Sequence, residues 1–294
     1  MPFANPDALV STEWLGRHLR APDVRIVDGS WHLPDSGRNA RAGYDAGHVP
    51  GAVFFDIDEI ADTESPLPHT LPASEKFTAR VRKLGLGDGN RIVVYDGVGL
   101  YSAARVWWMF RVFGHEDVAV LDGGLDKWRA EGRPVTDDVT MPKERHFTTR
   151  FNSLLLRGFD EIWRNLDEAR EQVVDARSPG RFSGTEPEPR AGLRSGHIPA
   201  SRNVHYQSLL SSEDGTLLPA EELSRRFEAA GVDLARPIVT SCGSGVTAAI
   251  LTLALHLIGH DDVPIYDGSW SEWGARGDAP VETGGASESS SPQI

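Results

Sequence analysis

The sequence has only one cysteine, Cys242, among its 294 residues. A single thiol excludes a disulfide within the chain and is typical of a reducing compartment. No apolar run approaches the ~20 residues that a membrane-spanning helix needs, and residues 1–15 lack the pattern of a secretory signal. The sequence therefore predicts a cytoplasmic protein with no membrane partner.

Positive charge is also scarce. Lysine and arginine number 30 against 43 aspartates and glutamates, so the formal net charge is -13. This balance disfavours nucleic acid and anionic membranes as partners. An anionic substrate would need a local cluster of arginines, whereas solubility alone explains the net charge.

Several well-known site patterns are missing. The sequence contains neither His-X-X-Glu-His nor Cys-X-X-Cys, which predicts no metal centre. Residues 97–99 (GVG) lack the third glycine of a dinucleotide fingerprint, and residues 243–245 (GSG) lack the lysine of a phosphate-binding loop. Where a cysteine phosphatase carries the arginine of its loop, this chain has Ala248. We therefore expect no metal, no cofactor and no phosphate-ester hydrolysis.

The segment around Cys242 carries the strongest signal. The apolar run 237–240 predicts a buried strand, and the apolar run 246–258 predicts a buried helix. Cys242 then lies in a tight turn between them, where Gly243 and Gly245 permit unusual backbone angles. Amides that converge at a helix start form an anion site, which favours a reactive thiolate. The alternative is an inert buried cysteine.

The chain also repeats itself. Five patterns of the first half return in the second half in the same order. The matching pairs are residues 26–28 and 173–175, 47–51 and 196–200, 92–99 and 238–245, 114–118 and 259–263, and 121–123 and 266–268. These ordered matches predict two copies of one α/β domain, each a mainly parallel sheet with helices on both faces.

Local patterns within the first copy predict individual elements. Ser11 is expected to cap a helix over 11–19, and a second helix is expected over 102–113. Short apolar runs predict strands over 24–28, 91–95 and 118–121.

The matches also define the domains. The first is expected at residues 9–137 and the second at 159–283, with a linker at 138–158 and a flexible Gly/Ser-rich tail at 284–294. The first copy has Asp96 where the second has Cys242, so we expect an inactive first domain and a catalytic second domain. The cleft between the domains, at the carboxyl ends of the strands, is the expected site.

Arginines follow the first strand of the second copy, in a stretch rich in glycine and proline that predicts an irregular loop. They are Arg177, Arg181, Arg190 and Arg194. Arginine binds a carboxylate through two parallel hydrogen bonds, whereas most single surface arginines are solvated charges. Spacing alone does not select among the four.

Other candidates are a serine and two histidines. Ser244 is close enough to Cys242 to hydrogen-bond a group bound at the sulfur, and the alternative is a cap for the following helix. His48 and His197 occupy matching turns, which favours a structural hydrogen bond to backbone for His197. His48 stays a candidate site residue if the first domain faces the cleft.

Together these motifs resemble the two-domain rhodanese-like sulfurtransferases, and in particular the 3-mercaptopyruvate sulfurtransferases, over about residues 9–281. The most specific match is the loop 242–248 (CGSGVTA). Thiosulfate-using members carry two basic residues directly after the cysteine, where this chain has Gly243 and Ser244. Further matches lie at residues 47–52, 101–108, 180–190 and 266–270.

The resemblance implies transfer of sulfur from 3-mercaptopyruvate through a persulfide on Cys242, with release of pyruvate. By the same resemblance, Arg181 and Arg190 would bind the carboxylate and keto oxygen of the donor. A Ser/His/Asp relay of the family maps onto Ser244 and His48, but its acid falls at Asn39, which cannot act as a carboxylate base. The loop residues expected to bind the donor are Gly243, Gly245, Val246 and Thr247.

The implied acceptor is a small thiol, a thioredoxin-like protein or cyanide. Two alternatives stay open: thiosulfate:cyanide sulfur transfer as the main activity, and a non-catalytic rhodanese-like binding module. The loop 242–248 argues against the first alternative. An intact Cys242 together with Arg181 and Arg190 argues against the second.

Overall fold

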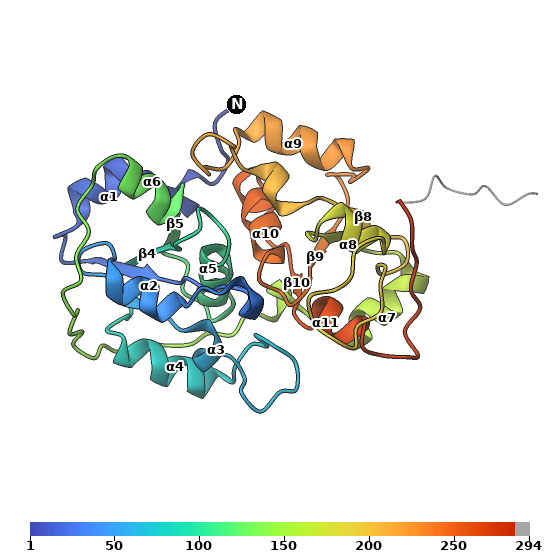
Figure 1. Cartoon of the computed structure of the whole chain (residues 1–294), viewed down its shortest axis with the longest axis horizontal. Helices are drawn as coiled ribbons and strands as arrows, with labels where there is room; N and C mark the ends of the chain where they lie inside the picture. The colour runs from blue at the N-terminus through green and yellow to red at the C-terminus, as the bar shows by residue number, and fades with distance from the viewer. Residues whose placement is uncertain (286–294) are drawn as a thin grey trace, which may run out of the picture.

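The computed structural model describes residues 1–285. It contains two α/β domains, one coloured blue to green and the other yellow to red (Figure 1). This confirms the fold class predicted from the sequence. Of the predicted tail, the residues from 286 onward lie outside the described residues.

The first sheet has the strand order β1-β5-β4-β2-β3, and every neighbouring pair is parallel. Its central strands are buried on both faces, because Ile92 and Val94 point into one core and Val93 and Tyr95 into another. The strands are β1 (Leu9–Val10), β2 (Val24–Asp28), β3 (Val53–Phe54), β4 (Arg91–Tyr95) and β5 (Val118–Leu121). The helices are α1 (Thr12–His18), α2 (Ala40–Ala46), α3 (Ile57–Ile60), α4 (Ser74–Lys83), α5 (Ala103–Val112) and α6 (Gly124–Ala130).

The second sheet repeats this topology with the parallel order β6-β10-β9-β7-β8. Each strand takes the place of the first-domain strand numbered five lower, which is the result expected for a duplication. The strands are β6 (Leu156–Arg157), β7 (Gln172–Asp175), β8 (Arg202–Asn203), β9 (Ile238–Ser241) and β10 (Ile265–Tyr266). The helices are α7 (Phe159–Glu168), α8 (Pro179–Ser183), α9 (Ala220–Ala229), α10 (Ala248–Leu257) and α11 (Ser269–Trp273).

Helices α5 and α10 pack against each other between the domains (Figure 1). One continuous apolar core includes residues of both helices and of both sheets. Since α5 follows the loop of Asp96 and α10 follows the loop of Cys242, this packing brings both loops to the domain boundary. Among residues 1–285, no helix has the length and apolar character of a membrane span.

The local predictions hold in most places. The strands at 24–28, 91–95 and 118–121 are confirmed with the same bounds. Ser11 caps α1, because its Oγ accepts the backbone N–H of Trp14 (3.1 Å). The expectation of a wholly irregular loop after β7 is wrong, because α8 forms there. Ser178 accepts the backbone N–H of Arg181 (3.4 Å), and Pro179 suits the first helical position.

Candidate active site

Cys242 lies between the end of β9 and the start of α10, as predicted, and is buried. The start of α11 holds this loop. The backbone N–H of Cys242 donates to Ser269 Oγ (3.2 Å), and the Gly243 carbonyl accepts from the N–H (2.8 Å) and the Oγ (2.6 Å) of Ser271. Gly245 has a φ of +77°, and a Cβ there would lie 2.9 Å from a buried guanidinium. Both the backbone angle and the space therefore require glycine at this position.

The backbone amides of residues 243–248 have no hydrogen-bond acceptor within the described chain. Four amides of the equivalent first-domain loop do have one, the buried carboxylate of Asp96. It accepts from the backbone N–H groups of Val98 (3.0 Å), Tyr101 (2.7 Å), Ser102 (2.8 Å) and Ala103 (2.8 Å). In the first domain the loop thus aims its amides at a carboxylate. The second domain has Cys242 at the same place.

Two predicted arginines lie against the Cys242 loop. The Nη2 of Arg181 would be 2.8 Å from a Cβ at Gly243, so its guanidinium lies directly over this glycine. The Nη2 of Arg190 donates to Ser244 Oγ (3.4 Å). Burial lowers the pKa of Arg190, although the neighbouring Cys242 acts in the opposite direction. The structure therefore brings both arginines to the loop.

The other two predicted arginines have structural contacts. Glu188, which is buried, accepts from Arg181 Nη2 (2.6 Å) and from Arg177 Nη1 (2.7 Å). Arg177 is also buried and bonds Asp175 (2.7 Å). Arg194 donates to three backbone carbonyls near α11. Glu188 thus fixes Arg181 beside the Cys242 loop, while Arg177 and Arg194 hold the surrounding fold.

Ser244 begins a hydrogen-bonded chain that the sequence did not predict. Its Oγ lies 3.0 Å from Nδ1 of His69, and Nε2 of His69 lies 3.1 Å from Oδ1 of Asp58. The other oxygen of Asp58 accepts from Trp31 Nε1 (2.9 Å). Burial raises the pKa of Asp58, but the hydrogen bonds from His69 and Trp31 outweigh burial, so the pKa lies below its usual value.

This order of contacts determines where the protons lie. An ionised carboxylate can only accept hydrogen bonds, so Nε2 of a neutral His69 must carry the hydrogen that faces Asp58. Its Nδ1 then has a free lone pair toward Ser244 Oγ. The geometry is that of a serine whose proton can pass to a histidine oriented by a carboxylate.

His69 reaches Ser244 from the first domain, out of the loop before α4. Its φ of +63° is rare for a residue with a side chain. The loop before α9 is its counterpart, since the closing hydrogen bonds end on Thr70 and Thr216 respectively. In that loop Gly215 holds the matching place, with a φ of +71°. The left-handed backbone at His69 stores strain of about 1–3 kcal/mol, which is typical of functional sites.

The structure does not bring His48 to Ser244. Nδ1 of His48 lies 2.8 Å from the Tyr44 carbonyl, and the two rings stack. His197 makes the same two contacts with Phe182, again at 2.8 Å. The predicted structural role of His197 is confirmed, and His48 repeats it in the first domain.

Asn39, the predicted counterpart of the family's acid, is also elsewhere. Its Oδ1 accepts the backbone N–H of Ala42 (2.8 Å) and caps α2. His69 and Asp58 occupy the places expected for His48 and Asn39. Sequence reasoning missed both because neither lies in a repeated motif. The segment around His69 showed only the proline-rich pattern of a loop at 65–72, and Asp58 lies in the short helix α3.

Aromatic side chains line the same region. Trp31 stacks with Tyr101 at 6.2 Å between ring centroids, and Tyr101 meets Tyr206 at 5.6 Å. Burial, followed by the nearby charges of Tyr206 and Cys242, raises the pKa of Tyr101. The Tyr101 hydroxyl therefore stays protonated near neutral pH.

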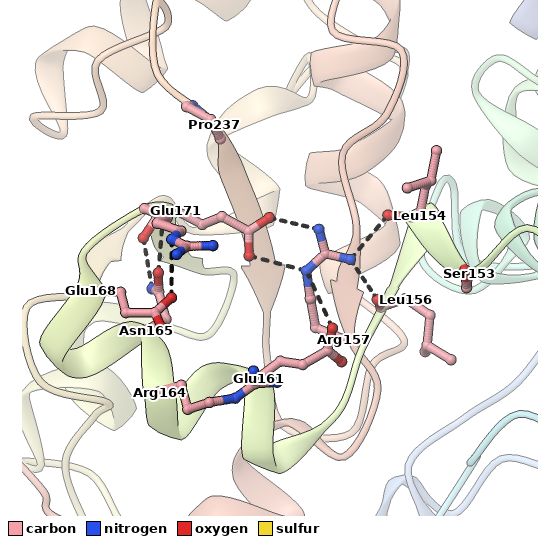
Figure 2. Close-up of a pocket in the computed structure, with 11 residues that line it drawn as sticks. Ser153, Leu154, Leu156, Arg157, Glu161, Arg164, Asn165, Glu168, Glu171 and Pro237 are labelled. Carbon is pink, nitrogen blue, oxygen red and sulfur yellow. Dashed lines mark hydrogen bonds and ion pairs between the residues drawn. The ribbon is translucent and has the colours of Figure 1, made fainter.

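A separate pocket of about 600 Å³ lies between β6 and α7 (Figure 2). Two of its three arginines, Arg157 and Arg170, are paired with carboxylates. Arg157 bonds both carboxylate oxygens of Glu171 (2.8 and 3.1 Å), and Arg170 pairs with Glu168 (3.0 Å). None of the predicted site residues lines this pocket.

Comparison with known proteins agrees with the site. The family model of the rhodanese-like domain matches residues 11–131 and 159–276. The 3-mercaptopyruvate sulfurtransferase of Homo sapiens is 46% identical over 92% of this chain and 92% of its own length. The thiosulfate sulfurtransferase of Rattus norvegicus is 47% identical over 94% of each. The mitochondrial thiosulfate/3-mercaptopyruvate sulfurtransferase 1 of Arabidopsis thaliana is 46% identical over 94% of this chain and 78% of its own.

A solved structure has the same architecture. The crystal structure of SseA from Escherichia coli, described among the 3-mercaptopyruvate sulfotransferases, superposes with a TM-score of 0.82 at 39% identity. The match covers 90% of this chain and 99% of that one. The chain therefore belongs to the rhodanese family, as a sulfurtransferase built from two rhodanese-like domains.

Proposed function

We propose that this sulfurtransferase takes sulfur from 3-mercaptopyruvate and passes it to a thiol through a persulfide on Cys242. The amides of residues 243–248 carry this proposal, since they lack an acceptor within the described chain, whereas Asp96 accepts four amides of the equivalent first-domain loop. Such amides stabilise a thiolate and equally the persulfide anion that replaces it. Cys242 is thus the nucleophile.

The donor is assigned from the residues beside the sulfur. Relatives named for thiosulfate and for 3-mercaptopyruvate are about equally identical to this chain, at 47% and 46%, so identity does not separate them. A dianionic donor such as thiosulfate favours cations directly after the cysteine. This chain has Gly243 and Ser244 there, and Arg181 lies over the glycine. Arg181 and Arg190 suit the single carboxylate and the keto oxygen of 3-mercaptopyruvate.

The first half-reaction forms one bond and breaks another. The Cys242 thiolate attacks the donor sulfur, the S–S bond forms, and the C–S bond breaks. The electron pair of the C–S bond passes to the carbon beside the keto group, which gives the enolate of pyruvate. The sulfur is oxidised and the carbon reduced, so no outside oxidant is needed. Arg181 and Arg190 stabilise the enolate oxygen and the carboxylate.

Ser244, His69 and Asp58 move the proton in this step. The donor thiol must lose a proton, and the enolate carbon must gain one. Ser244 Oγ, backed by Nδ1 of His69, can accept the first proton and return it to the carbon. Asp58 keeps the imidazole oriented and stabilises its protonated form. The amides of Gly243, Gly245, Val246 and Thr247 hold the persulfide left on Cys242.

In the second half-reaction an acceptor thiolate attacks the outer sulfur and restores the Cys242 thiolate. The acceptor is a small thiol or a thioredoxin-like protein, and cyanide serves in the assay. Two separate half-reactions predict ping-pong kinetics.

Mass spectrometry of the intact chain tests the covalent step. Treatment with 3-mercaptopyruvate alone is expected to add the mass of one sulfur atom, and peptide mapping is expected to place it on Cys242. Cyanide is expected to remove it. The Cys242→Ser variant is the matched control and is expected to stay unmodified with an unchanged melting temperature. Absence of the adduct in the wild-type chain supports a binding module instead and refutes the proposal.

Initial rates with 3-mercaptopyruvate and with thiosulfate, at the same cyanide concentration, test the donor. We expect kcat/KM for 3-mercaptopyruvate to exceed that for thiosulfate by about 100-fold, since one lost pairing of buried charge costs about 3 kcal/mol. Preference for thiosulfate would overturn the donor assignment but would not contradict the persulfide on Cys242.

The cytoplasm is the proposed compartment, because a lone buried thiol that must cycle through a thiolate works best under reducing conditions. A relative from Arabidopsis thaliana is named as mitochondrial. Fractionation of cells that express the tagged chain distinguishes the two compartments.

A further inference from the structure

A buried ion pair joins the two domains beside the relay. Arg105, on α5 of the first domain, has no exposed surface, and its Nη2 lies 2.7 Å from Oδ1 of Asp267, directly after β10 of the second domain. The guanidinium also lies over the ring of Trp108, at 4.4 Å from the centroid. Burying two charges carries a desolvation cost, so the pair is weak evidence for stability and calls for another explanation.

Arg105 and Asp267 both hydrogen-bond to the loop that carries His69. Arg105 Nη2 donates to the carbonyl of His69 (2.6 Å). Oδ2 of Asp267 accepts the backbone N–H of Leu71 (2.8 Å). The two charged groups therefore hold the loop at the residues before and after Thr70. The first of these residues, His69, has the left-handed backbone. Arg105 Nη1 also lies 3.4 Å from the carbonyl of Gly245, so the same guanidinium touches the Cys242 loop.

The duplication provides an internal comparison. In the second domain the loop before α9 crosses to the first domain in the same manner, and Leu217 N–H donates to Asp122 (2.9 Å). Asp122 follows β5 as Asp267 follows β10. The third residue of α5 is Arg105, but the third residue of α10 is Ile250. The aspartate–loop contact thus occurs twice, and the arginine occurs only where the loop carries a histidine.

The surroundings of the two aspartates differ as well. Burial raises the pKa of Asp122 to about 6, while the Leu217 amide and Lys127 act in the opposite direction. Gly215 takes the place of His69. A Cβ added to Gly215 would lie 3.6 Å from the Cα of Gly99. This loop has no histidine to position and docks without an arginine, although Lys127 of α6 pairs with Asp214 of the same loop (2.8 Å).

We propose that Arg105 and Asp267 are positioning residues that hold His69 against Ser244 across the domain boundary. The inference rests on the relay proposed above, because the pair acts only through His69. The bonds to the His69 carbonyl and to the Leu71 amide fix the strained turn between them. This places Nδ1 of His69 within hydrogen-bond distance of Ser244 Oγ.

The sharpest variant is Arg105→Ile, which copies the arrangement at Ile250 and Asp122. Because the second copy of the contact docks without arginine, this variant is expected to fold. We expect kcat with 3-mercaptopyruvate to fall about 10- to 100-fold, the effect of a small misplacement of a catalytic group. KM is expected to stay within about twofold, since Arg181 and Arg190 bind the donor. Asp122→Asn is the matched control and is expected to keep the wild-type kcat.

A double-mutant cycle with His69→Ala tests whether Arg105 affects kcat through His69. His69→Ala alone is expected to lower kcat at least as much as Arg105→Ile, and the double variant is expected to match His69→Ala within about twofold. Full additivity would show that Arg105 acts through another residue and would overturn the proposal. So would a wild-type kcat for Arg105→Ile. If His69→Ala itself keeps full activity, the relay fails as well, and the two failures are thereby distinguished.

Arg105 could also act on the Cys242 loop through its contact with the Gly245 carbonyl, and labelling of Cys242 tests this alternative. Cys242 is the only thiol, so iodoacetamide reports on its loop alone. Arg105→Ile is expected to react within about twofold of the wild-type rate, because the loop stays bound to α11. A labelling rate changed in parallel with kcat would mean that the pair shapes the Cys242 loop, which contradicts the proposal. Should Arg105→Ile fail to fold, Asp267→Asn, which keeps an acceptor for Leu71, undergoes the same measurements.

Discussion

Replacing Asp96 with asparagine is expected to destabilise the first domain by about 2–4 kcal/mol. One carboxylate oxygen accepts three amides, those of Tyr101, Ser102 and Ala103, and the other accepts the amide of Val98. Asparagine has one oxygen. Its best orientation keeps the three bonds and turns its NH2 group toward the Val98 N–H, where two donors face each other in a fully buried place. Losing one partner in this way costs about 1–3 kcal/mol, and loss of the charge weakens the three remaining bonds.

Urea unfolding measures this cost, followed by circular dichroism and tryptophan fluorescence. Asp28→Asn is the matched control at another strand end. Asp28 is buried and accepts the backbone N–H of Ser30 (2.9 Å), and burial raises its pKa, so asparagine resembles its neutral form. We expect this control to cost less than about 1 kcal/mol. An Asp96→Asn cost no larger than that of Asp28→Asn would refute the assignment of the loop as an anion site.

The same loop gives a second measurement. Asp96→Ala removes the acceptor from the amides of Val98 and residues 101–103. Sulfate is expected to bind there and to stabilise the variant by an amount that grows with its concentration, about 2.7 kcal/mol at 100 times its Kd. The wild-type chain in sulfate, and both chains in chloride of equal ionic strength, correct for general salt effects. Equal stabilisation of both chains by sulfate would contradict the reasoning.

Three further outcomes are expected. Gly243→Ala puts a Cβ 2.8 Å from Nη2 of Arg181, so KM for 3-mercaptopyruvate should rise about 10-fold with kcat nearly unchanged, as initial rates will report. Asp58→Asn removes the carboxylate that orients His69, so single-turnover release of pyruvate should slow about 100-fold, and an unchanged rate would exclude the relay. Burial and Arg111 lower the pKa of His256 from 6.5 to about 4, although Asp261 acts to raise it. The unfolded chain then binds the proton first, and stability is lost as pH falls from about 6.5 to 4. Thermal melts of His256→Gln should lack this loss of about 1–2 kcal/mol, allowing for partial solvent exposure.

The sequence predicted those parts of the fold that depend on local patterns and on the repeat. The strands of the first copy, the strand–turn–helix around Cys242 and the duplicated topology follow from apolar runs, glycines and the repeat. These features need only neighbouring residues or a comparison of the two halves. Arg181 and Arg190 were selected by the family resemblance instead, because spacing did not separate them from Arg177 and Arg194, and both lie against the Cys242 loop.

The relay could not be predicted because it is a contact between domains. His69 lies 175 residues from Ser244, in a loop without a motif. Its left-handed backbone is the feature that would normally select glycine, as at Gly215, so local propensity argues against the observed residue. Asp58 opens a short helix and has no sequence signal that separates it from other surface acids. Tertiary packing alone assembles these groups.

The division of the relay between domains has a consequence for the fusion of the two copies. Asp58 and His69 belong to one half and Ser244 to the other, so a separate second domain would keep the Cys242 loop but lose its proton relay. Joining the halves in one chain makes their encounter intramolecular, and the effective concentration of the His69 loop beside Ser244 then no longer depends on how much protein the cell makes. The first domain, which has no cysteine, thus acts as a covalently tethered subunit of the domain that carries Cys242.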